Sequence, residues 1–170
     1  LTGGSAFLIR RLSATARAAL LKELFGNTDN SIGISYLRIS LGASDLSASV
    51  FSYDDMPAGQ TDEDLSEFNL SQDTVDLIPL LKEIIAVRPG IKIMASPWSP
   101  PVWMKNNGSS VGGNLLPQYY GVYAQYFVKV SYALEIYNGI AVSLAVGYAQ
   151  RFPLENMNHF SFFKSSKKDY

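Results

Sequence analysis

The sequence contains no cysteine and only one histidine, His159. Without cysteine there is no disulfide framework, no thiolate metal site and no cysteine nucleophile. A single histidine excludes a multi-histidine zinc centre and argues against a serine hydrolase triad. The chemistry of this chain therefore has to come from carboxylates, amides and aromatic side chains.

Strong charge and long apolar runs are also missing. The formal net charge of the 170 residues is −1, and the one basic cluster, Lys164 with Lys167 and Lys168, lies at the C-terminal end. Nucleic-acid binding needs clustered lysine and arginine, so we expect no nucleic-acid partner. No apolar run approaches the ~20 residues of a membrane span, so we expect no transmembrane segment. No signal peptide is visible in the chain.

What is present is an alternation of helical and strand-like periodicity. Ser13 is a plausible N-cap for the first helix, which has Ala16, Leu20 and Leu24 on one face, and Asp73 is a plausible N-cap for the second. The pattern predicts helices over residues 14–25, 73–87 and 117–137, and strands over 32–41, 91–94 and 140–146. This order indicates an α/β fold with a parallel sheet. The last helix has an apolar stripe that we expect to pack on the strands: Tyr119, Tyr123, Tyr126, Phe127 and Val130.

Two polar or aromatic residues follow directly on predicted strands. Asp45 comes after the strand at 32–41, and Trp98 after the strand at 91–94. In parallel sheets the loops after the strand C-termini carry the chemistry, so we expect both residues on one rim. The long connection, residues 45–71, contains the acidic run 62–64, which we interpret as a solvated surface.

The most distinctive stretch is the tryptophan segment, residues 95–108, which reads ASPWSPPVWMKNNG. Flat aromatic faces pack on the apolar face of a pyranose ring, and amide side chains bind its hydroxyls. The segment therefore favours the floor of a sugar subsite. The alternative is a pair of core tryptophans beneath a loop stiffened by proline.

Several motifs together resemble glycoside hydrolase family 30, in particular its glucosylceramidase (acid β-glucosidase) type. The resemblance rests on the tryptophan segment and on further stretches that follow in family order: YLRISLGASD at 36–45, SYDD at 52–55, FNLSQD at 68–73, LIPLLK at 77–82 and YAQYFVK at 123–129. It implies a partial (β/α)8 TIM barrel, about strands two to four with their helices. We place this fragment of the catalytic domain at residues 1–147, followed by a poorly matching tail at 148–170.

The resemblance also implies substrate-binding residues. Asp45 matches an aspartate that binds sugar hydroxyls, and Trp98 matches a tryptophan that contacts glucose. Arg38, inside a strand, would hold the catalytic carboxylates in place. Trp103 and Asn107 belong to the same sugar-binding segment, with a supporting role favoured over direct contact.

The catalytic carboxylates of the family are not found at the matched positions. Aligned on Gln150 and Pro153, Phe152 occupies the position of the acid/base glutamate, and a phenyl ring cannot transfer a proton. Glu155 is a candidate substitute. The nucleophile of the family follows the seventh strand, which this chain does not include. The match decays after Ala141, which favours either a change of reading frame or a divergent, inactive relative.

The resemblance predicts a retaining glycoside hydrolase, a glucosylceramidase that cleaves the β-glucosidic bond of glucosylceramide without a cofactor. This chain alone would be inactive and would need the rest of the barrel. The predicted partner is a glucoside or glucosylceramide, reached at a membrane surface, and the predicted location is secreted or lysosomal. A β-1,6-glucanase or another β-glycanase of the family is one alternative; a non-catalytic sugar-binding remnant and a partial gene product are others.

Overall fold

The computed structural model describes residues 1–28, 30–137 and 139–144. Its centre is a parallel sheet of three strands, β1 (Tyr36–Leu41), β2 (Lys92–Pro97) and β3 (Ser143–Leu144), in the order β1-β2-β3. The strands β1 and β2 pair in register along their whole length, and Leu41 lies opposite Pro97 at their C-terminal ends. The α/β class and the parallel sheet predicted from the alternation are confirmed.

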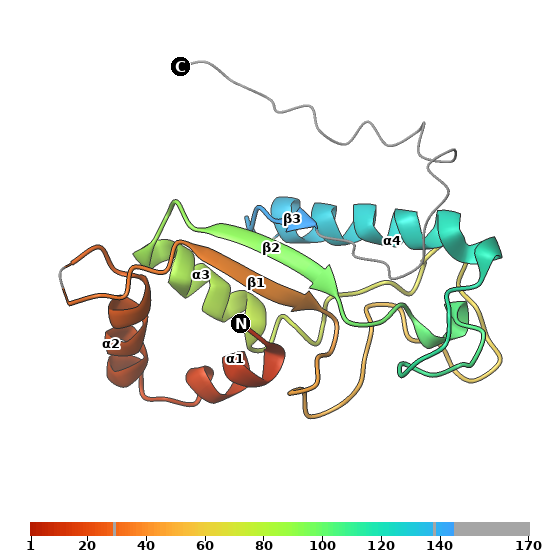
Figure 1. Ribbon diagram of the computed structural model, residues 1–170, viewed down its shortest axis with the longest axis horizontal. Helices are drawn as coiled ribbons and strands as arrows, with labels where there is room; N and C mark the ends of the chain where they lie inside the picture. Colours follow the sequence, from red (N-terminus) through yellow and green to blue (C-terminus); the bar gives the residue numbers. More distant parts are fainter. Residues whose placement is uncertain (29, 138, 145–170) are drawn as a thin grey trace, which may run out of the picture.

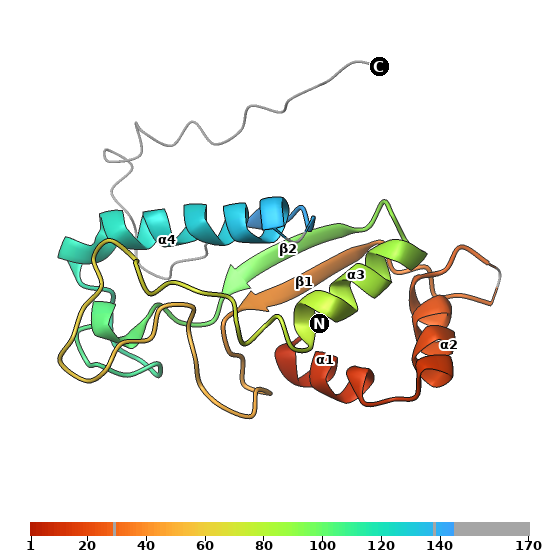
Figure 2. The same cartoon turned by 180° about the vertical axis from the view of Figure 1, so that it is seen from behind.

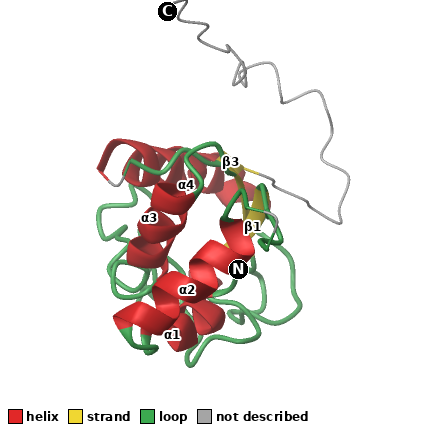
Figure 3. Ribbon diagram, turned by 90° about the vertical axis from the view of Figure 1, so that its left-hand side faces the viewer, coloured by secondary structure: helices red, strands yellow, loops and turns green. Residues whose placement is uncertain are grey.

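The helices that connect the strands cover one face of this sheet. Helix α3 (Leu77–Val87) joins β1 to β2, and helix α4 (Tyr120–Tyr132) leads from β2 toward β3 (Figures 1 and 2). Viewed from the side, the strands lie on one side of the molecule and the helices on the other (Figure 3). The strand residues beneath the helices are apolar and buried, namely Leu37, Ile39, Leu41, Ile93 and Ala95. Two such βα units followed by a third strand form a piece of a (β/α)8 barrel.

Helix α4 confirms the predicted apolar stripe. A 3₁₀ turn, η2 (Pro117–Tyr119), begins the helix with proline, and a π-helical turn, η3 (Ala133–Tyr137), ends it. The side chains predicted to face the sheet are all buried: Tyr119, Tyr123, Tyr126, Phe127 and Val130. The predicted strand at 140–146 is present at 143–144, and its last two residues lie outside the described part.

Two helices pack beside α3 at the start of the chain. Helix α1 (Gly3–Arg10) was not predicted, because two glycines at its start weaken a helical pattern. Thr2 caps it, since its side chain accepts a hydrogen bond from the Ser5 amide at 3.1 Å. Glu83 on α3 binds Arg10 of α1 and, at 2.7 Å, Arg17 of the next helix. One carboxylate thus fastens both helices to α3.

Helix α2 (Ala14–Phe25) has the predicted limits, and the predicted cap is confirmed, since Ser13 accepts from the Ala16 amide. The predicted apolar face is right in part, since Leu24 packs against the core and Leu20 is half-buried. Leu21 and Phe25 are buried, whereas Ala16 is exposed. The helix has a weak amphipathic pattern, and the Arg17–Glu83 pair adds to the contacts of its leucines with the rest of the protein.

Two element boundaries also differ from the prediction. Helix α3 begins at Leu77 with Asp76 at the N-cap position, and Asp73 is no cap. The Asp73 carboxylate is buried and accepts a hydrogen bond from the Tyr53 hydroxyl instead. Strand β1 begins at Tyr36 and not at Ile32, whose side chain is exposed. In both cases a contact distant in sequence decides the boundary.

Within the described residues, no helix is long and apolar enough to cross a bilayer.

Candidate functional site

The candidate site lies where β1 and β2 end. Strand β1 ends at Leu41, and Gly42 turns the chain at a φ of 75°. The Phe51 carbonyl lies 2.9 Å from where a β-carbon at Gly42 would be, so this position requires glycine. The Ala43 amide then donates to the same carbonyl at 2.9 Å. This contact closes a loop that presents Asp45 above the strand ends.

Asp45 and Trp98 meet on this rim, as their positions after the two strands predict. The Trp98 indole Nε1 donates to Asp45 Oδ1 at 2.8 Å. The contact follows from the register, because the strands that carry the two residues end side by side. Asp45 is exposed and Trp98 half-buried, so both are accessible to a ligand.

The space beside Trp98 and the second oxygen of Asp45 limit how a sugar can bind. The gap that Trp98 lines with Val50, Phe51 and Pro100 has a volume of about 10 Å³. Such a gap holds about one water molecule and is too small for a sugar ring. The remaining oxygen of Asp45, Oδ2, has no hydrogen-bond partner in the residues that the structure describes. It is oriented by the indole contact and can accept a hydroxyl donor.

Arg38 lies on β1, on the sheet face that the helices leave uncovered. Its Nε donates to Ser96 Oγ on β2 at 2.8 Å, and Ser96 is itself buried. Among the described residues no carboxylate pairs with this guanidinium. The predicted role of Arg38, to hold catalytic carboxylates, stays a prediction. Ser96 had no sequence signal beyond its place in the tryptophan segment.

Trp103 is held from two sides. Its Nε1 donates to the Asp54 carbonyl oxygen at 2.9 Å, and its ring packs edge-on against Tyr119, with ring centroids 5.0 Å apart. These contacts join the tryptophan segment to the long connection and to the start of α4. The predicted role of Trp103 in the sugar site, whether supporting or in direct contact with a sugar, stays a prediction.

Asn107 uses its amide within its own loop. Its Nδ2 donates to the Val111 carbonyl at 2.9 Å, and its Oδ1 accepts from the Ser109 amide at 3.2 Å. The nearby Lys105 is buried, which lowers the pKa of its ammonium group, and it donates to Ser99 and to the Ser110 carbonyl. Both side chains stabilise the loop, so a contact of Asn107 with substrate would require these bonds to open.

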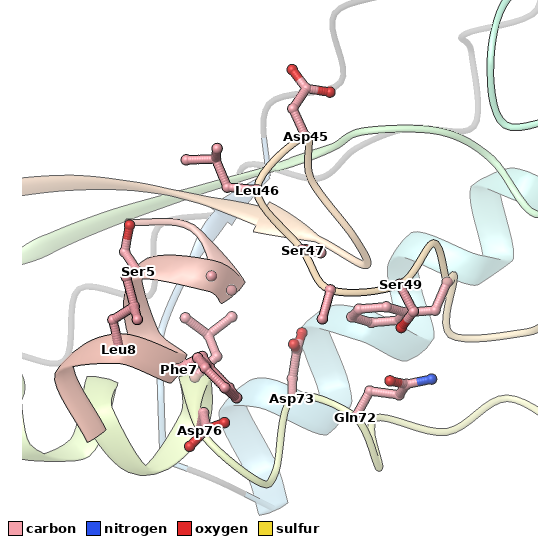
Figure 4. Close-up of a pocket in the computed structure, with 15 residues that line it drawn as sticks. Ser5, Phe7, Leu8, Asp45, Leu46, Ser47, Ser49, Gln72, Asp73 and Asp76 are labelled. Carbon is pink, nitrogen blue, oxygen red and sulfur yellow. The ribbon is translucent and has the colours of Figure 1, made fainter. Parts of the chain in front are cut away.

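Behind the Asp45 loop lies a cavity of about 540 Å³ between the start of α1, the loop after β1 and the start of α3 (Figure 4). Its walls include Phe7, Leu46, Phe51 and Leu77. The close-up shows that the Asp45 carboxylate points away from this cavity, while the Asp73 carboxylate points toward it. The cavity and the Asp45–Trp98 pair are therefore neighbouring but separate features.

Asp73 is the polar group at the base of this cavity. Burial raises the pKa of its carboxyl to about 6, although the hydrogen bond from Tyr53 acts in the opposite direction. Burial, together with the adjacent Asp73, raises the pKa of the Tyr53 hydroxyl well above its usual value. The pair stabilises the start of α3, and the tyrosine stays protonated at any physiological pH.

Two buried carboxyls were missed from the sequence. Asp54 is 1% exposed and Asp62 is 5% exposed, so the interpretation of the whole acidic run as a solvated surface is wrong for Asp62. Its neighbours Glu63 and Asp64 are exposed as predicted. The sequence offered one signal that these acids are buried. Buried apolar residues lie near both of them in the long connection, Tyr53 next to Asp54 and Leu65 three positions after Asp62.

The predicted catalytic positions, Phe152 and Glu155, lie outside the described residues. The described residues contain no group of three or more histidine, cysteine, aspartate or glutamate side chains arranged to hold a metal ion.

Comparison with known proteins settles the family. Residues 1–157 match the Glycosyl hydrolase family 30 TIM-barrel domain. The chain belongs to glycoside hydrolase family 30. The partial (β/α)8 barrel expected from the motifs is therefore confirmed, and the two observed βα units with the third strand are part of the family 30 barrel.

The curated relatives of this family 30 chain carry two kinds of name. It is 41% identical over 133 residues to an endo-1,6-β-D-glucanase of Neurospora crassa, covering 75% of this chain and 27% of that enzyme. It is 34% identical over 137 residues to the lysosomal acid glucosylceramidase of Mus musculus, covering 76% of this chain and 25% of that enzyme. The chain thus spans about a quarter of the length of these relatives.

Solved structures give the same family. The endo-β1,6-glucanase BT3312 superposes with a TM-score of 0.74 at 35% identity, over 83% of this chain and 31% of that one. SrfJ from Salmonella typhimurium has the same TM-score at 28% identity, again over 83% of this chain and 31% of that one. These relatives and structures share the family, and their names divide over the substrate.

Proposed function

We propose that this chain supplies the glucose-binding part of a retaining β-glucoside hydrolase. The observation that carries the proposal is the contact between the Trp98 indole and the Asp45 carboxylate at the C-terminal rim of the sheet. The rim is where (β/α)8 enzymes bind their substrates. An aromatic ring beside an oriented carboxylate suits a pyranose, which has an apolar face and hydroxyl groups at its edge.

In this proposal the two residues bind and orient the sugar but carry out no bond cleavage. A retaining glycosidase needs a general acid/base and a nucleophile, two carboxyl groups ~5–5.5 Å apart. Asp45 already accepts the indole N–H, and its role is to receive a hydroxyl proton in a hydrogen bond. Arg38, with Ser96 fixing its orientation, would face the catalytic carboxylates from the inner side of the barrel.

Two substrates are supported, a β-1,6-glucan and glucosylceramide. The relative with 41% identity is named an endo-1,6-β-D-glucanase, which supports a β-1,6-glucan. Glucosylceramide, the prediction from the sequence motifs, is supported by the glucosylceramidases among the relatives and by the apolar cavity beside the Asp45 loop. A lipid aglycone would bury apolar surface there, whereas a second glucose unit would not.

The test uses the full product of the gene that contains this chain. Release of glucose from glucosylceramide in detergent, and release of new reducing ends from a linear β-1,6-glucan, are measured for the unaltered protein and for the variants Asp45→Asn and Trp98→Ala. We expect hydrolysis of one substrate with retention of the β-configuration, and a loss of about 100-fold or more in kcat/KM in both variants.

A matched control is Asp64→Asn, an exposed aspartate of the acidic run, which should leave kcat/KM unchanged. Saturable glucoside binding without turnover would replace the hydrolase by a sugar-binding protein. Full activity of Asp45→Asn would overturn the assignment of the glucose site to this rim.

A further inference from the structure

The long connection buries two carboxyl groups against each other. Asp54 is 1% exposed and Asp62 is 5% exposed, and the two carboxyl groups are close enough that each shifts the pKa of the other. Buried carboxylates are costly unless each oxygen has a hydrogen-bond donor or a positive charge beside it. The two members of this pair differ sharply in that respect.

Asp62 has donors for both of its oxygens. Its Oδ1 accepts from the Ser66 hydroxyl at 3.0 Å, and its Oδ2 accepts from the Glu67 amide at 2.7 Å. Asp54 has none: within the described residues, neither of its carboxyl oxygens has a donor. Asp62 is therefore arranged to be an anion, and Asp54 is arranged to be a neutral acid whose proton is donated to Asp62.

The backbone of Asp54 joins this pair to the tryptophan segment. Its carbonyl oxygen accepts the Trp103 indole N–H at 2.9 Å. Trp103 lies in the 3₁₀ turn η1 (Val102–Met104), which follows Trp98 in the chain. The pair therefore lies where the loop that carries Asp45 is fixed to the loop that carries Trp98.

We propose that Asp54 and Asp62 share a single proton, and that this acid–carboxylate pair positions the tryptophan segment against the long connection. When Asp54 loses its proton, two anions face each other in a buried space, and the contact between the Asp54 backbone and Trp103 loosens. The proton sharing is independent of what the protein cleaves, whereas its effect on sugar binding rests on the proposed function.

The surrounding charges agree with this assignment. Burial, with the adjacent charge of Asp62, raises the pKa of the Asp54 carboxyl to about 7, and Asp55 adds to the rise. For Asp62, burial raises the pKa, but the hydrogen bonds from Glu67 and Ser66 outweigh it and the pKa is lowered overall.

The other side chains around the pair do not neutralise its negative charge, so the shared proton has this role. From α4, the Tyr126 hydroxyl interacts with Asp54 and Asp55, and burial keeps its pKa well above the usual value. Lys129 on the same helix donates to the carbonyls of Asp64 and Leu65, and no ion pair joins it to Asp62 in the part of the chain that the structure describes. The Trp103 indole N–H binds the Asp54 carbonyl.

The experiment follows the Trp103 indole N–H by NMR in the full gene product between pH 4 and pH 9. We expect its resonance to shift with a midpoint near 7 in the unaltered protein, as the pKa of Asp54 requires. Asp54→Asn, whose amide donates to Asp62 without titrating, should abolish the shift and keep the fold. Glu63→Gln, an exposed position of the same acidic run, should leave the midpoint unchanged.

A resonance that does not shift over this range, or an unchanged midpoint in Asp54→Asn, would overturn the proposal. If Asp54→Asn does not fold, carbon-13 NMR of aspartate-labelled unaltered protein decides, since one carboxyl must titrate near pH 7. Glucoside affinity is measured in the same samples. If the proton is shared but glucoside affinity is the same on both sides of pH 7, the pair has no effect on sugar binding. If no glucoside binds at any pH, the result counts against the proposed function alone.

Discussion

The Trp98 indole and the Asp45 carboxylate form a hydrogen bond of 2.8 Å between residues 53 positions apart in the sequence. The bond joins the loops after two neighbouring strands, so it fixes an aromatic ring and an acceptor relative to each other. We expect their contributions to glucoside binding to be coupled. In a double-mutant cycle with Asp45→Asn and Trp98→Phe, the coupling energy should be about 1 kcal/mol.

The cycle is measured by calorimetric titration of the full gene product with a methyl β-glucoside. Trp98→Phe keeps a ring but removes the N–H, so the loss in that variant reports the hydrogen bond and not the stacking surface. Additive losses would mean that the contact orients neither residue for the sugar.

The start of α1 approaches the Asp45 loop so closely that it tolerates no side chain. A β-carbon at Gly4 would lie 1.9 Å from the Leu46 carbonyl oxygen, whereas one at Gly3 would meet only Ser47 Oγ at 3.5 Å. Gly4→Ala should therefore displace the loop, lower stability by about 1–3 kcal/mol and weaken glucoside binding. Gly3→Ala should be neutral or stabilising, since alanine favours a helix. Urea unfolding of the two variants tests this, and equal stabilities would contradict the close approach.

Glu83 holds two helices through one carboxylate. It binds Arg10 on α1 and Arg17 on α2, and its side chain is only partly exposed. Glu83→Gln should lower the free energy of unfolding by about 1 kcal/mol, because partly solvated ion pairs contribute little each. Glu23→Gln, on the exposed side of α2, is the matched control. Hydrogen exchange should show faster exchange confined to α1 and α2, and uniform acceleration over the sheet would argue against this role.

Asp73 gives stability a dependence on acid pH. Its folded pKa of about 6 exceeds the ordinary value of 3.8, so the folded state binds this proton more tightly than the unfolded state. The free energy of unfolding should therefore fall as pH rises from about 4 to about 6, with a slope of up to about 1.4 kcal/mol per pH unit. Asp73→Asn should remove this part of the slope.

The measurement is urea unfolding at intervals between pH 4 and pH 8, with Asp64→Asn as the exposed control. In Asp73→Asn the Asp54 carboxyl still makes the free energy of unfolding depend on pH, up to about pH 7. The Asp73 contribution ends near pH 6, so the two carboxyls can be told apart. An identical pH profile in Asp73→Asn and the unaltered protein would show that Asp73 has an ordinary pKa.

Local patterns predicted much of this fold. Ser13 and Pro117 mark helix starts through capping and a fixed backbone angle, and the stripe of Tyr119, Tyr123 and Tyr126 follows the helical repeat. Asp45 and Trp98 could be placed on one rim because parallel strands end at the same edge. These are properties of short segments, and the sequence contains them directly.

What could not be predicted depends on contacts between distant segments. Aspartate is a common helix cap, but the Asp73 carboxylate is buried and accepts a hydrogen bond from the Tyr53 hydroxyl. Asp62 lies in an acidic run that is typical of an exposed surface, but its side chain is buried beside Asp54, Ser66 and the Glu67 amide. A single sequence gives the charge of such residues and not their neighbours. The domain boundary at 147 and the roles of Phe152 and Glu155 stay predictions.

The order of the strands has a consequence for how the protein is made. Strands β1, β2 and β3 pair in the order in which they occur in the chain, so each pairing joins neighbours in sequence. Synthesis proceeds from the N-terminus, so β1 and β2 are present before β3, although their pairing joins segments as far apart as Tyr36 and Lys92. The rim with Asp45 and Trp98 is complete once β2 has left the ribosome. The residues of the proposed sugar-binding rim are thus present before any residue that is encoded farther along the chain.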